Sequence, residues 1–143
     1  MIYKLYKLEN VFYKIKLVPF AFLIRLFMRI VFSCDIPYKT KIGKGTCFPH
    51  YALGVLIHPN VIIGKNCKIL HGVTIGGKSG NPNLPVIEDN VLIGAGAIII
   101  GNIRIGKNSI IGAGSVVTHD VKPFTIVAGN PAKFIKKVGN YNE

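Results

Sequence analysis

The sequence predicts an all-β fold, a parallel solenoid of triangular coils, with a short α-helical segment in front of it. The first observation is a six-residue beat of branched apolar residues that recurs between residues 36 and 121. The second is a glycine that often follows the apolar residue and permits a tight turn. The third is a change at the N-terminus, where residues 17–32 read LVPFAFLIRLFMRIVF and show helical spacing of their apolar positions.

A period of six residues fits neither an α-helix nor a simple alternating strand. We interpret each six as one flat side of a coil and a turn, with the large apolar residue in the interior. Three sides close one coil, and parallel strands of neighbouring coils lie about 4.8 Å apart. Residues eighteen apart should therefore stack, and the sequence predicts one such column from Ile57, Ile75, Ile93 and Ile111.

The chain is expected to have three parts. Residues 1–34 form an N-terminal helical segment, residues 35–122 form the solenoid, and residues 123–143 form a C-terminal cap and tail. Residues 76–86, GGKSGNPNLPV, keep the spacing of the beat but are glycine, proline and polar residues, which predicts an extruded loop. A cap suits the open end of a solenoid. We expect the last five residues, 139–143, to be disordered.

The beat also slips early in the solenoid. Between Phe48 and Ile57 the chain advances nine residues, which is one six plus three more. The count places Phe48 in the column of Ile69. His50 and His71 each follow two residues later, so both should point outward at the same corner, about 5 Å apart by the strand spacing. The sequence therefore predicts a stacked pair of histidines beside a bulged turn.

Composition narrows the classes of partner. The formal net charge of +12 favours anionic partners such as phosphates and acidic lipid headgroups. The sequence shows no zinc-finger spacing, no aromatic RNA-binding run and no basic recognition helix, so we expect no nucleic-acid partner. The cysteines, Cys34, Cys47 and Cys67, lack CxxC spacing. Their pattern argues against a disulfide framework or a zinc site and favours a reducing compartment.

The apolar run at residues 17–32 has two expected environments. Lysines precede it, as in a signal sequence, but Arg25 and Arg29 interrupt it and no A-x-A cleavage site follows. The run is also too short and too charged for a comfortable membrane span. The helices should therefore either pack on the solenoid or lie in a membrane surface. The second environment would place a cytoplasmic protein at the inner face of a bacterial membrane.

The chain resembles the hexapeptide-repeat acyltransferases, which fold as left-handed parallel β-helices. The resemblance covers about residues 35–138 and is strongest to the serine acetyltransferase branch and to its relatives that O-acetylate bacterial polysaccharides. It rests on DIPYKTKIGKGTCFPHYALGVLI, ILHGVTIGGKSG, IEDNVLIGAGAIIIGNIRIGKNSIIGAGSVV and VAGNPAKFI. It implies a left-handed β-helix, a homotrimer, and acetyl-CoA as co-substrate in the groove between adjacent coils.

The motif match also implies roles for single residues. His50 would be the general base that takes the proton from the acceptor hydroxyl, and Asp35, fifteen residues earlier, would hydrogen-bond its other ring nitrogen. The acceptor pocket would be lined by His71, Pro49 and Tyr51. Coenzyme A would be bound by Gly76, Gly77, Lys78, Ala95, Ala113 and Lys133.

The expected acceptor follows from departures from serine acetyltransferases. Those enzymes carry an acidic residue before the catalytic histidine and a histidine in the extruded loop, where this chain has Pro49 and Leu84. They also carry a long helical N-terminal domain, whereas only the segment 1–34 precedes Asp35 here. We therefore expect acetyl transfer to a carbohydrate hydroxyl in capsule, O-antigen or exopolysaccharide biosynthesis. The alternative is serine O-acetyltransferase of cysteine biosynthesis.

Two further alternatives use the same fold. A γ-class carbonic anhydrase would hold zinc with three histidines, but the four histidines of this chain lack the expected HxxxxH pair. We expect His58 and His119 to be turn residues, and we expect no metal site. A non-catalytic structural β-helix would leave the match of Asp35 and His50 to the family's motif unexplained.

Overall fold

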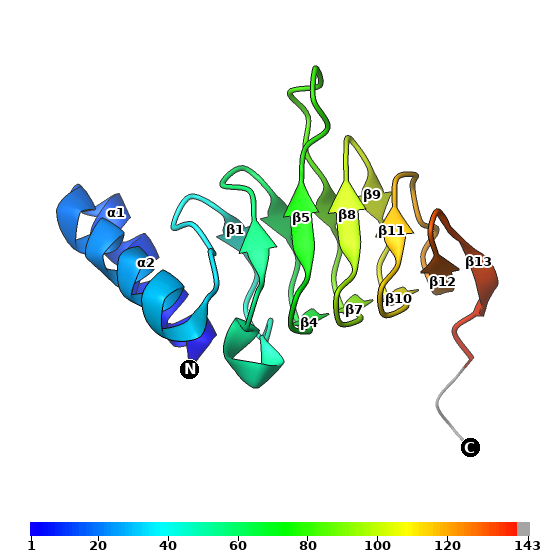
Figure 1. Cartoon of the computed structure of the whole chain (residues 1–143), viewed down its shortest axis with the longest axis horizontal. Coiled ribbons are helices and arrows are strands. Elements are labelled where there is room, and N and C mark those ends of the chain that lie inside the picture. Colours follow the sequence, from blue (N-terminus) through cyan, green and yellow to red (C-terminus); the bar gives the residue numbers. More distant parts are fainter. Residues whose placement is uncertain (140–143) are drawn as a thin grey trace.

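Two helices stand at one end of a column of short strands in the computed structural model, which describes residues 1–139 (Figure 1). Helix α1 spans Ile2–Lys14 and helix α2 spans Val18–Phe32. Three parallel sheets follow and fit the predicted left-handed β-helix of hexapeptide repeats. The class all-β is nevertheless too narrow, because the two helices together form a layer of their own over the first coil.

The strands belong to three sheets, one for each side of the triangle. The first sheet contains β1 (Lys41–Ile42), β3 (Ile62–Ile63), β6 (Val86–Ile87) and β9 (Arg104–Ile105). The second contains β4 (Lys68–Ile69), β7 (Leu92–Ile93), β10 (Ile110–Ile111), β12 (Thr125–Gly129) and β13 (Ala132–Lys137). The third contains β2 (Leu56–Ile57), β5 (Thr74–Gly76), β8 (Ile98–Ile100) and β11 (Val116–Val117). Only β12 and β13 pair antiparallel among these strands, and their hairpin lies at the C-terminal end.

The core of the coil is the column of residues that the beat marks. In each two-residue strand the second residue is buried and the first faces outward, as in β3, where Ile63 is 2% exposed and Ile62 is 42% exposed. Small residues such as Cys67 and Ser115 fill the buried corners. A fully buried isoleucine stabilises the fold by roughly 1.5–3 kcal/mol. The repeated isoleucines therefore supply most of the driving force for winding the chain into coils.

The predicted stacking of residues eighteen apart is wrong around the extruded loop. Ile75 pairs with Ile99 and not with Ile93, so its partner lies one six further along the chain than expected. Ile93 pairs instead with Ile69 on one side and with Ile111 on the other. The chain between β5 and β6 leaves the coil and projects from the top of Figure 1, so it uses one six without adding a side to the triangle.

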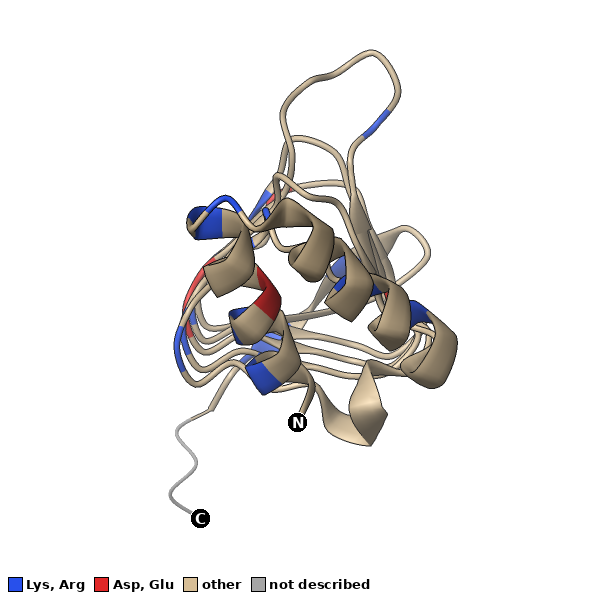
Figure 2. Ribbon diagram, turned by 90° about the vertical axis from the view of Figure 1, so that its left-hand side faces the viewer, with Lys and Arg blue, Asp and Glu red and all other residues tan. Residues whose placement is uncertain are grey.

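The helical hairpin closes the N-terminal end of the coil. The Tyr6 hydroxyl donates a hydrogen bond to the carbonyl of Thr40 at 2.6 Å and accepts one from the N–H of Ile42 at 3.3 Å. Ile2 and Met28 are buried in the same apolar cluster as the interior of the coil. Figure 2 looks onto this end and shows both helices lying across it. The hairpin therefore packs on the β-helix through one face and leaves the opposite face exposed.

Within residues 1–139 neither α1 nor α2 combines the length and the apolar character needed to cross a membrane. Of the five residues predicted to be disordered, 140–143 lie outside the described residues, and Gly139 has no regular secondary structure.

Candidate active site

The three extra residues of the first coil form a strained turn. The 3-10 turn η1 spans Pro49–Ala52, and residues 50–52 have φ angles of 53°, 55° and 57°. Such left-handed conformations cost roughly 1–2 kcal/mol for each residue that is not glycine. The N–H of Leu53 donates to the carbonyl of His50 at 3.1 Å, and the N–H of Gly72 donates to the carbonyl of Leu53 at 2.7 Å. Backbone strain of this kind gathers at functional sites, so the turn is a candidate for one.

The turn places His50 against His71 of the next coil. Their ring centroids lie 5.3 Å apart, and the rings are perpendicular. A bridge between Cys47 and Lys68 sets the register of these two coils. Both histidines are exposed, so a ligand can reach either ring. The predicted stacking of the two histidines at one outward corner is therefore confirmed.

Small residues continue the same corner along the coil. The N–H of Gly96 donates to the carbonyl of His71 at 2.9 Å, and the N–H of Gly114 donates to the carbonyl of Ala95 at 2.8 Å. Ala95 and Ala113 thus occupy the place of His71 one and two coils further on. A Cβ atom on Gly96 or Gly114 would meet no atom within 4 Å. The corner is therefore open enough for an extended ligand to lie against the backbone.

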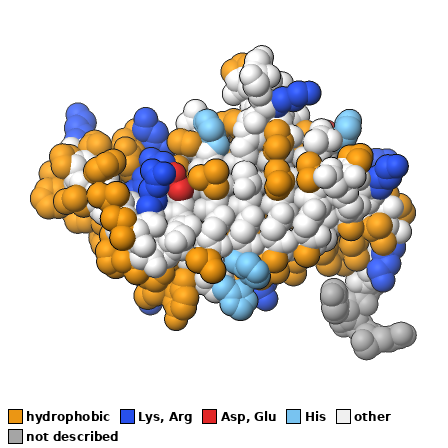
Figure 3. Space-filling model, viewed as in Figure 1, with side chains coloured by type: hydrophobic (Ala, Val, Ile, Leu, Met, Phe, Trp, Pro, Cys, Tyr) orange, Lys and Arg blue, Asp and Glu red, His pale blue; other side chains and the backbone are white. Residues whose placement is uncertain are grey.

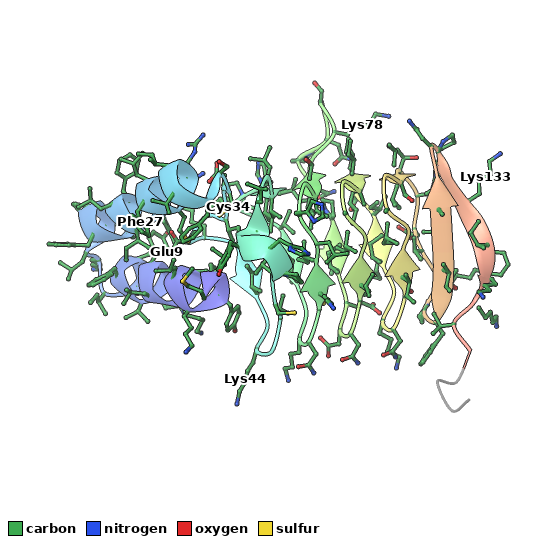
Figure 4. All side chains as sticks on the ribbon, turned by 60° about the horizontal axis from the view of Figure 1, so that its bottom comes forward. Glu9, Phe27, Cys34, Lys44, Lys78 and Lys133 are labelled. Carbon is green, nitrogen blue, oxygen red and sulfur yellow. The ribbon has the colours of Figure 1, made fainter. Side chains whose placement is uncertain are left out.

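The other residues predicted to bind coenzyme A lie elsewhere. Gly76 ends β5, and Gly77 and Lys78 begin the extruded loop, at the opposite edge of the sheet of β2, β5, β8 and β11 (Figure 1). Figure 4 shows Lys78 at this loop and Lys133 on β13, well separated from one another. Lys133 pairs with Ala128 of β12. A ligand that touches both the loop and the histidine corner must span the width of that sheet.

Asp35 is bound by arginines of α2 and not by His50. Arg25 donates from Nε to Oδ1 of Asp35 at 2.7 Å and from Nη2 to Oδ2 at 3.1 Å. Nη1 of Arg29 lies 3.8 Å from Oδ2. Among residues 1–139 no hydrogen bond joins Asp35 to His50, so the expected contact is not formed in this structure. The physical reason is that a bidentate guanidinium is a strong partner for a carboxylate and already holds it.

The backbone nevertheless brings Asp35 to the end of the strained turn. The N–H of Asp35 donates to the carbonyl of Val55 at 2.8 Å, and the N–H of Gly54 donates to the carbonyl of Ser33 at 3.0 Å. A cavity of about 320 Å³ opens here, and its lining includes Arg29, Ser33, Asp35, Gly54 and Leu56. Sequence reasoning missed this cavity. The available signal was the pair of arginines four residues apart that interrupts an otherwise apolar helix.

Two buried groups lie near this cavity. Glu9 is fully buried, and neither of its carboxylate oxygens has a hydrogen-bond partner within the described residues. Burial raises the pKa of Glu9 to about 8; the charge of Arg25 lowers it and that of Asp35 raises it. Figure 4 shows Glu9 between the two helices. Burial likewise raises the pKa of Cys34 to about 11, so this thiol stays protonated at neutral pH and is unsuited to act as a nucleophile.

The remaining candidate residues have simpler surroundings. Pro49 begins η1, and the ring of Tyr51 stacks on Phe32 of α2 with centroids 5.7 Å apart. Nδ1 of His58 accepts a hydrogen bond from the N–H of Asn60 at 3.3 Å, as a turn residue does. Over residues 1–139 the structure contains no group of three or more His, Cys, Asp or Glu residues that could hold a metal ion.

Comparison with known proteins identifies relatives of this chain in sequence and in structure. Residues 85–119 match the family described as bacterial transferase hexapeptide (six repeats). The serine acetyltransferase of Buchnera aphidicola subsp. Schizaphis graminum is 40% identical over 141 residues, which are 96% of this chain and 54% of that protein. The crystal structure of serine acetyltransferase in complex with coenzyme A from Brucella abortus matches with a TM-score of 0.90 and 37% identity, over 95% of this chain and 55% of that one. The Neisseria gonorrhoeae serine acetyltransferase in complex with serine matches with a TM-score of 0.85 and 41% identity, over 92% and 54%.

These relatives correct the expected acceptor. The prediction of a carbohydrate hydroxyl in surface polysaccharide biosynthesis is wrong, because the relatives in sequence and in structure are serine acetyltransferases. That prediction rested on Pro49, on Leu84 and on the short segment 1–34, and identity over nearly the whole chain outweighs these three departures. The chain spans about half the length of the relatives that it matches. Residues 85–119 carry the hexapeptide repeat of bacterial transferases, and the chain is related in sequence and in fold to serine acetyltransferases.

Proposed function

We propose that the chain transfers the acetyl group of acetyl-CoA to the hydroxyl of serine and so forms O-acetylserine and coenzyme A. The observation that carries this proposal is the corner at which His50 stacks on His71 beside a strained turn. An open, small-residue edge continues from that corner at Ala95 and Ala113. The relatives whose structures contain coenzyme A or serine support the choice of both substrates.

The chemistry assigns the proton transfer to His50. A hydroxyl is a weak nucleophile at neutral pH, and a positioned imidazole that takes its proton contributes about 10²–10⁴-fold in rate. The serine oxygen then attacks the thioester carbonyl, the C–S bond breaks, and the departing sulfur takes the proton back from the imidazolium. Backbone N–H groups at the glycine-rich corner are suitable donors for the oxyanion that forms on the carbonyl oxygen.

The carboxylate of Asp35 pairs with Arg25 in this structure and would pair with His50 during the reaction. That carboxylate can support the imidazolium of His50 only after it has exchanged the guanidinium of Arg25 for the ring. The backbone hydrogen bonds that join residues 33–35 to residues 54–55 keep Asp35 near the end of η1, from which its carboxylate could turn toward the ring. Asp35 is therefore proposed to orient His50, as the resemblance to serine acetyltransferases implies.

The cavity beside the turn is proposed to hold the amino-acid end of serine. Its volume of about 320 Å³ suits a small molecule, and Arg29 lines it with a side chain that is 58% exposed. An arginine fork matches a carboxylate in geometry and charge. Arg29 is thus the proposed partner of the serine carboxylate, while His71, Pro49 and Tyr51 remain the proposed walls on the side of the reacting hydroxyl.

Coenzyme A is proposed to lie along the coil. Gly76 and Gly77 would let its pantetheine chain approach the backbone, and Lys78 and Lys133 would meet its phosphates as point charges. Lys78 and Lys133 stand well apart along the coil (Figure 4), as contacts of an elongated ligand would. We also propose that the chain acts as a homotrimer.

The proposal is tested by coenzyme A release from acetyl-CoA, measured with a thiol reagent, in the presence and absence of L-serine. The full chain should release thiol in a serine-dependent manner and form O-acetylserine, detected by mass spectrometry. The variant His58→Ala provides a matched control, because His58 lies at the far edge of the sheet from His50. Folded wild-type protein that releases no thiol with serine would overturn the proposal.

A further inference from the structure

The outer face of the helical hairpin is a large exposed apolar surface. Most of the large hydrophobic side chains that are exposed within residues 1–139 belong to the segment 1–31, although that segment is a small part of the chain. Figure 3 shows hydrophobic side chains gathered over both helices at this end. Exposed apolar surface on this scale marks a site of interaction. The inner face of the same hairpin is already used in packing on the coil, so only the outer face is free for another partner.

The spacing of the exposed residues places them on the side of each helix that faces away from the coil. Along each helix, with Ile15 counted at the C-cap of α1, three of them follow one another at intervals of three and four residues, which places them on one side. We call these six residues the outer apolar face: Leu8, Val11, Ile15, Leu23, Leu26 and Ile30. Their exposed fractions range from 39% for Leu26 to 73% for Ile30.

The charges around this face are all positive. Lys4, Lys7 and Lys14 of α1 are exposed, and Lys7 and Lys14 each stand one residue before a member of the outer apolar face. Lys16 follows in the connecting turn and is exposed as well. Glu9 is the one acidic residue within the segment 1–34, and it is buried between the helices. The hairpin therefore presents an apolar face with a cationic edge and no exposed negative side chain.

We propose that the outer apolar face of α1 and α2 binds the surface of an anionic phospholipid bilayer. The apolar side chains would lie at the boundary of headgroups and acyl chains, and the lysines would meet the phosphates. Neither helix is suited to cross the bilayer, so the hairpin lies in its surface. A second copy of the chain is a poorer occupant, because two such faces would bring their lysines together. This binding is independent of acetyl transfer.

Flotation of the full chain with lipid vesicles tests the proposal. We expect binding to vesicles of phosphatidylcholine with about 30% phosphatidylglycerol, and roughly tenfold weaker binding to phosphatidylcholine alone or at high salt. The double variant Leu23→Glu with Ile30→Glu should lose at least about tenfold in binding. The matched control is Ile62→Glu with Ile135→Glu, an equal change at two exposed apolar residues of β3 and β13, which should bind as wild type does.

A second variant keeps the test independent of folding. Lys7→Glu with Lys14→Glu leaves the apolar residues in place and should also weaken binding to the anionic vesicles by about tenfold. Circular dichroism and the melting temperature report whether each variant is folded. The proposal is overturned if wild-type protein does not float with anionic vesicles, or if folded variants of both kinds bind as wild type does. Concentration-dependent self-association through this face without vesicle binding would also overturn it.

Discussion

The imidazole rings of His50 and His71 meet edge to face, with their centroids 5.3 Å apart, although they belong to successive coils of the chain. The winding of the β-helix brings them together, and three extra residues in the first of these coils push out the turn that carries His50. Both the strained turn and the contact with His71 therefore set the position of the His50 side chain.

Removal of the second histidine should weaken the orientation of the first. His71→Ala deletes an exposed ring, so the folded protein should keep its melting temperature within a few degrees. We expect kcat for serine acetylation to fall about tenfold, because the ring of His50 loses the contact that limits its rotation. Steady-state kinetics against the His58→Ala control measure this. An unchanged kcat would show that the contact between the rings has no part in the reaction.

Substitutions at Gly76 and Gly43 should have different effects, the first on ligand binding and the second on folding. A Cβ on Gly76 would meet no atom within 4 Å, so Gly76→Ala should fold normally but raise KM for acetyl-CoA by roughly tenfold, if a ligand approaches the backbone there. A Cβ on Gly43 would lie 2.5 Å from the backbone carbonyl carbon of Gly64, so Gly43→Ala should cost about 2 kcal/mol or more in the free energy of unfolding. Urea unfolding and KM values test the pair. Equal KM values for wild type and Gly76→Ala would remove Gly76 from the proposed site.

The buried carboxyl of Glu9 predicts how stability depends on pH. Its pKa is about 8 in the folded protein and about 4.3 in an unfolded chain, so the folded state binds more protons between these values. The stability contributed by the neutral carboxyl is complete below about pH 4 and is lost as the pH rises through about 8. The free energy of unfolding of wild type should therefore fall relative to Glu9→Gln between about pH 5 and pH 8.5.

Urea unfolding of both proteins across this pH range provides the measurement. The control is Glu88→Gln, because the hydrogen bond from Arg104 lowers the pKa of Glu88 and this residue stays ionised throughout the range. Parallel curves for wild type and Glu9→Gln would contradict the account of Glu9.

The ion pair between Arg25 and Asp35 should contribute to stability, whereas the one from Arg29 should not. Arg25→Gln leaves the carboxylate of Asp35, which is only 14% exposed, without its bidentate partner, and we expect a loss of about 2 kcal/mol in the free energy of unfolding. Arg29 lies 3.8 Å away with a side chain that is 58% exposed, so Arg29→Gln should change stability by less than about 0.5 kcal/mol.

For activity the two arginines should behave the other way round. Arg29, which contributes little to stability, should matter for catalysis, and Arg25 should not. If Asp35 leaves Arg25 to orient His50, folded Arg25→Gln should retain kcat, whereas Asp35→Asn should lower it by at least about tenfold. Arg29→Gln should raise KM for serine, because Arg29 is the proposed partner of the serine carboxylate. Loss of kcat in folded Arg25→Gln would show that Asp35 works from the position in which Arg25 holds it.

The six-residue period of the sequence is sufficient to predict the coil and the corner at which His50 meets His71. Phe48 stacks on Ile69 because each six residues make one side of the triangle, and counting sixes therefore locates His50 beside His71. The same counting failed after Ile75, because residues that keep the spacing of the beat can leave the coil without adding a side. Only the polar composition of residues 76–86 distinguishes the loop, and it does not show how many residues the coil loses.

The contacts between the helices and the coil could not be predicted in this way. The pairing of Arg25 with Asp35 and the burial of Glu9 depend on how α1 and α2 lie across the first coil, and no periodicity encodes that angle. Arginines within an apolar helix indicate that such partners exist, but not which they are. The prediction of a carbohydrate acceptor was wrong for a related reason. The residues that flank His50 in the sequence do not by themselves define the cavity beside it.

The central claim is that His50 removes the proton from the hydroxyl of serine. The most direct measurement is kcat for serine-dependent coenzyme A release by His50→Ala and by wild type, with the folded state of both verified by circular dichroism. The account predicts that His50→Ala loses about 10²–10⁴-fold in kcat, while the melting temperature changes little. A folded His50→Ala protein that acetylates serine as fast as wild type would contradict it.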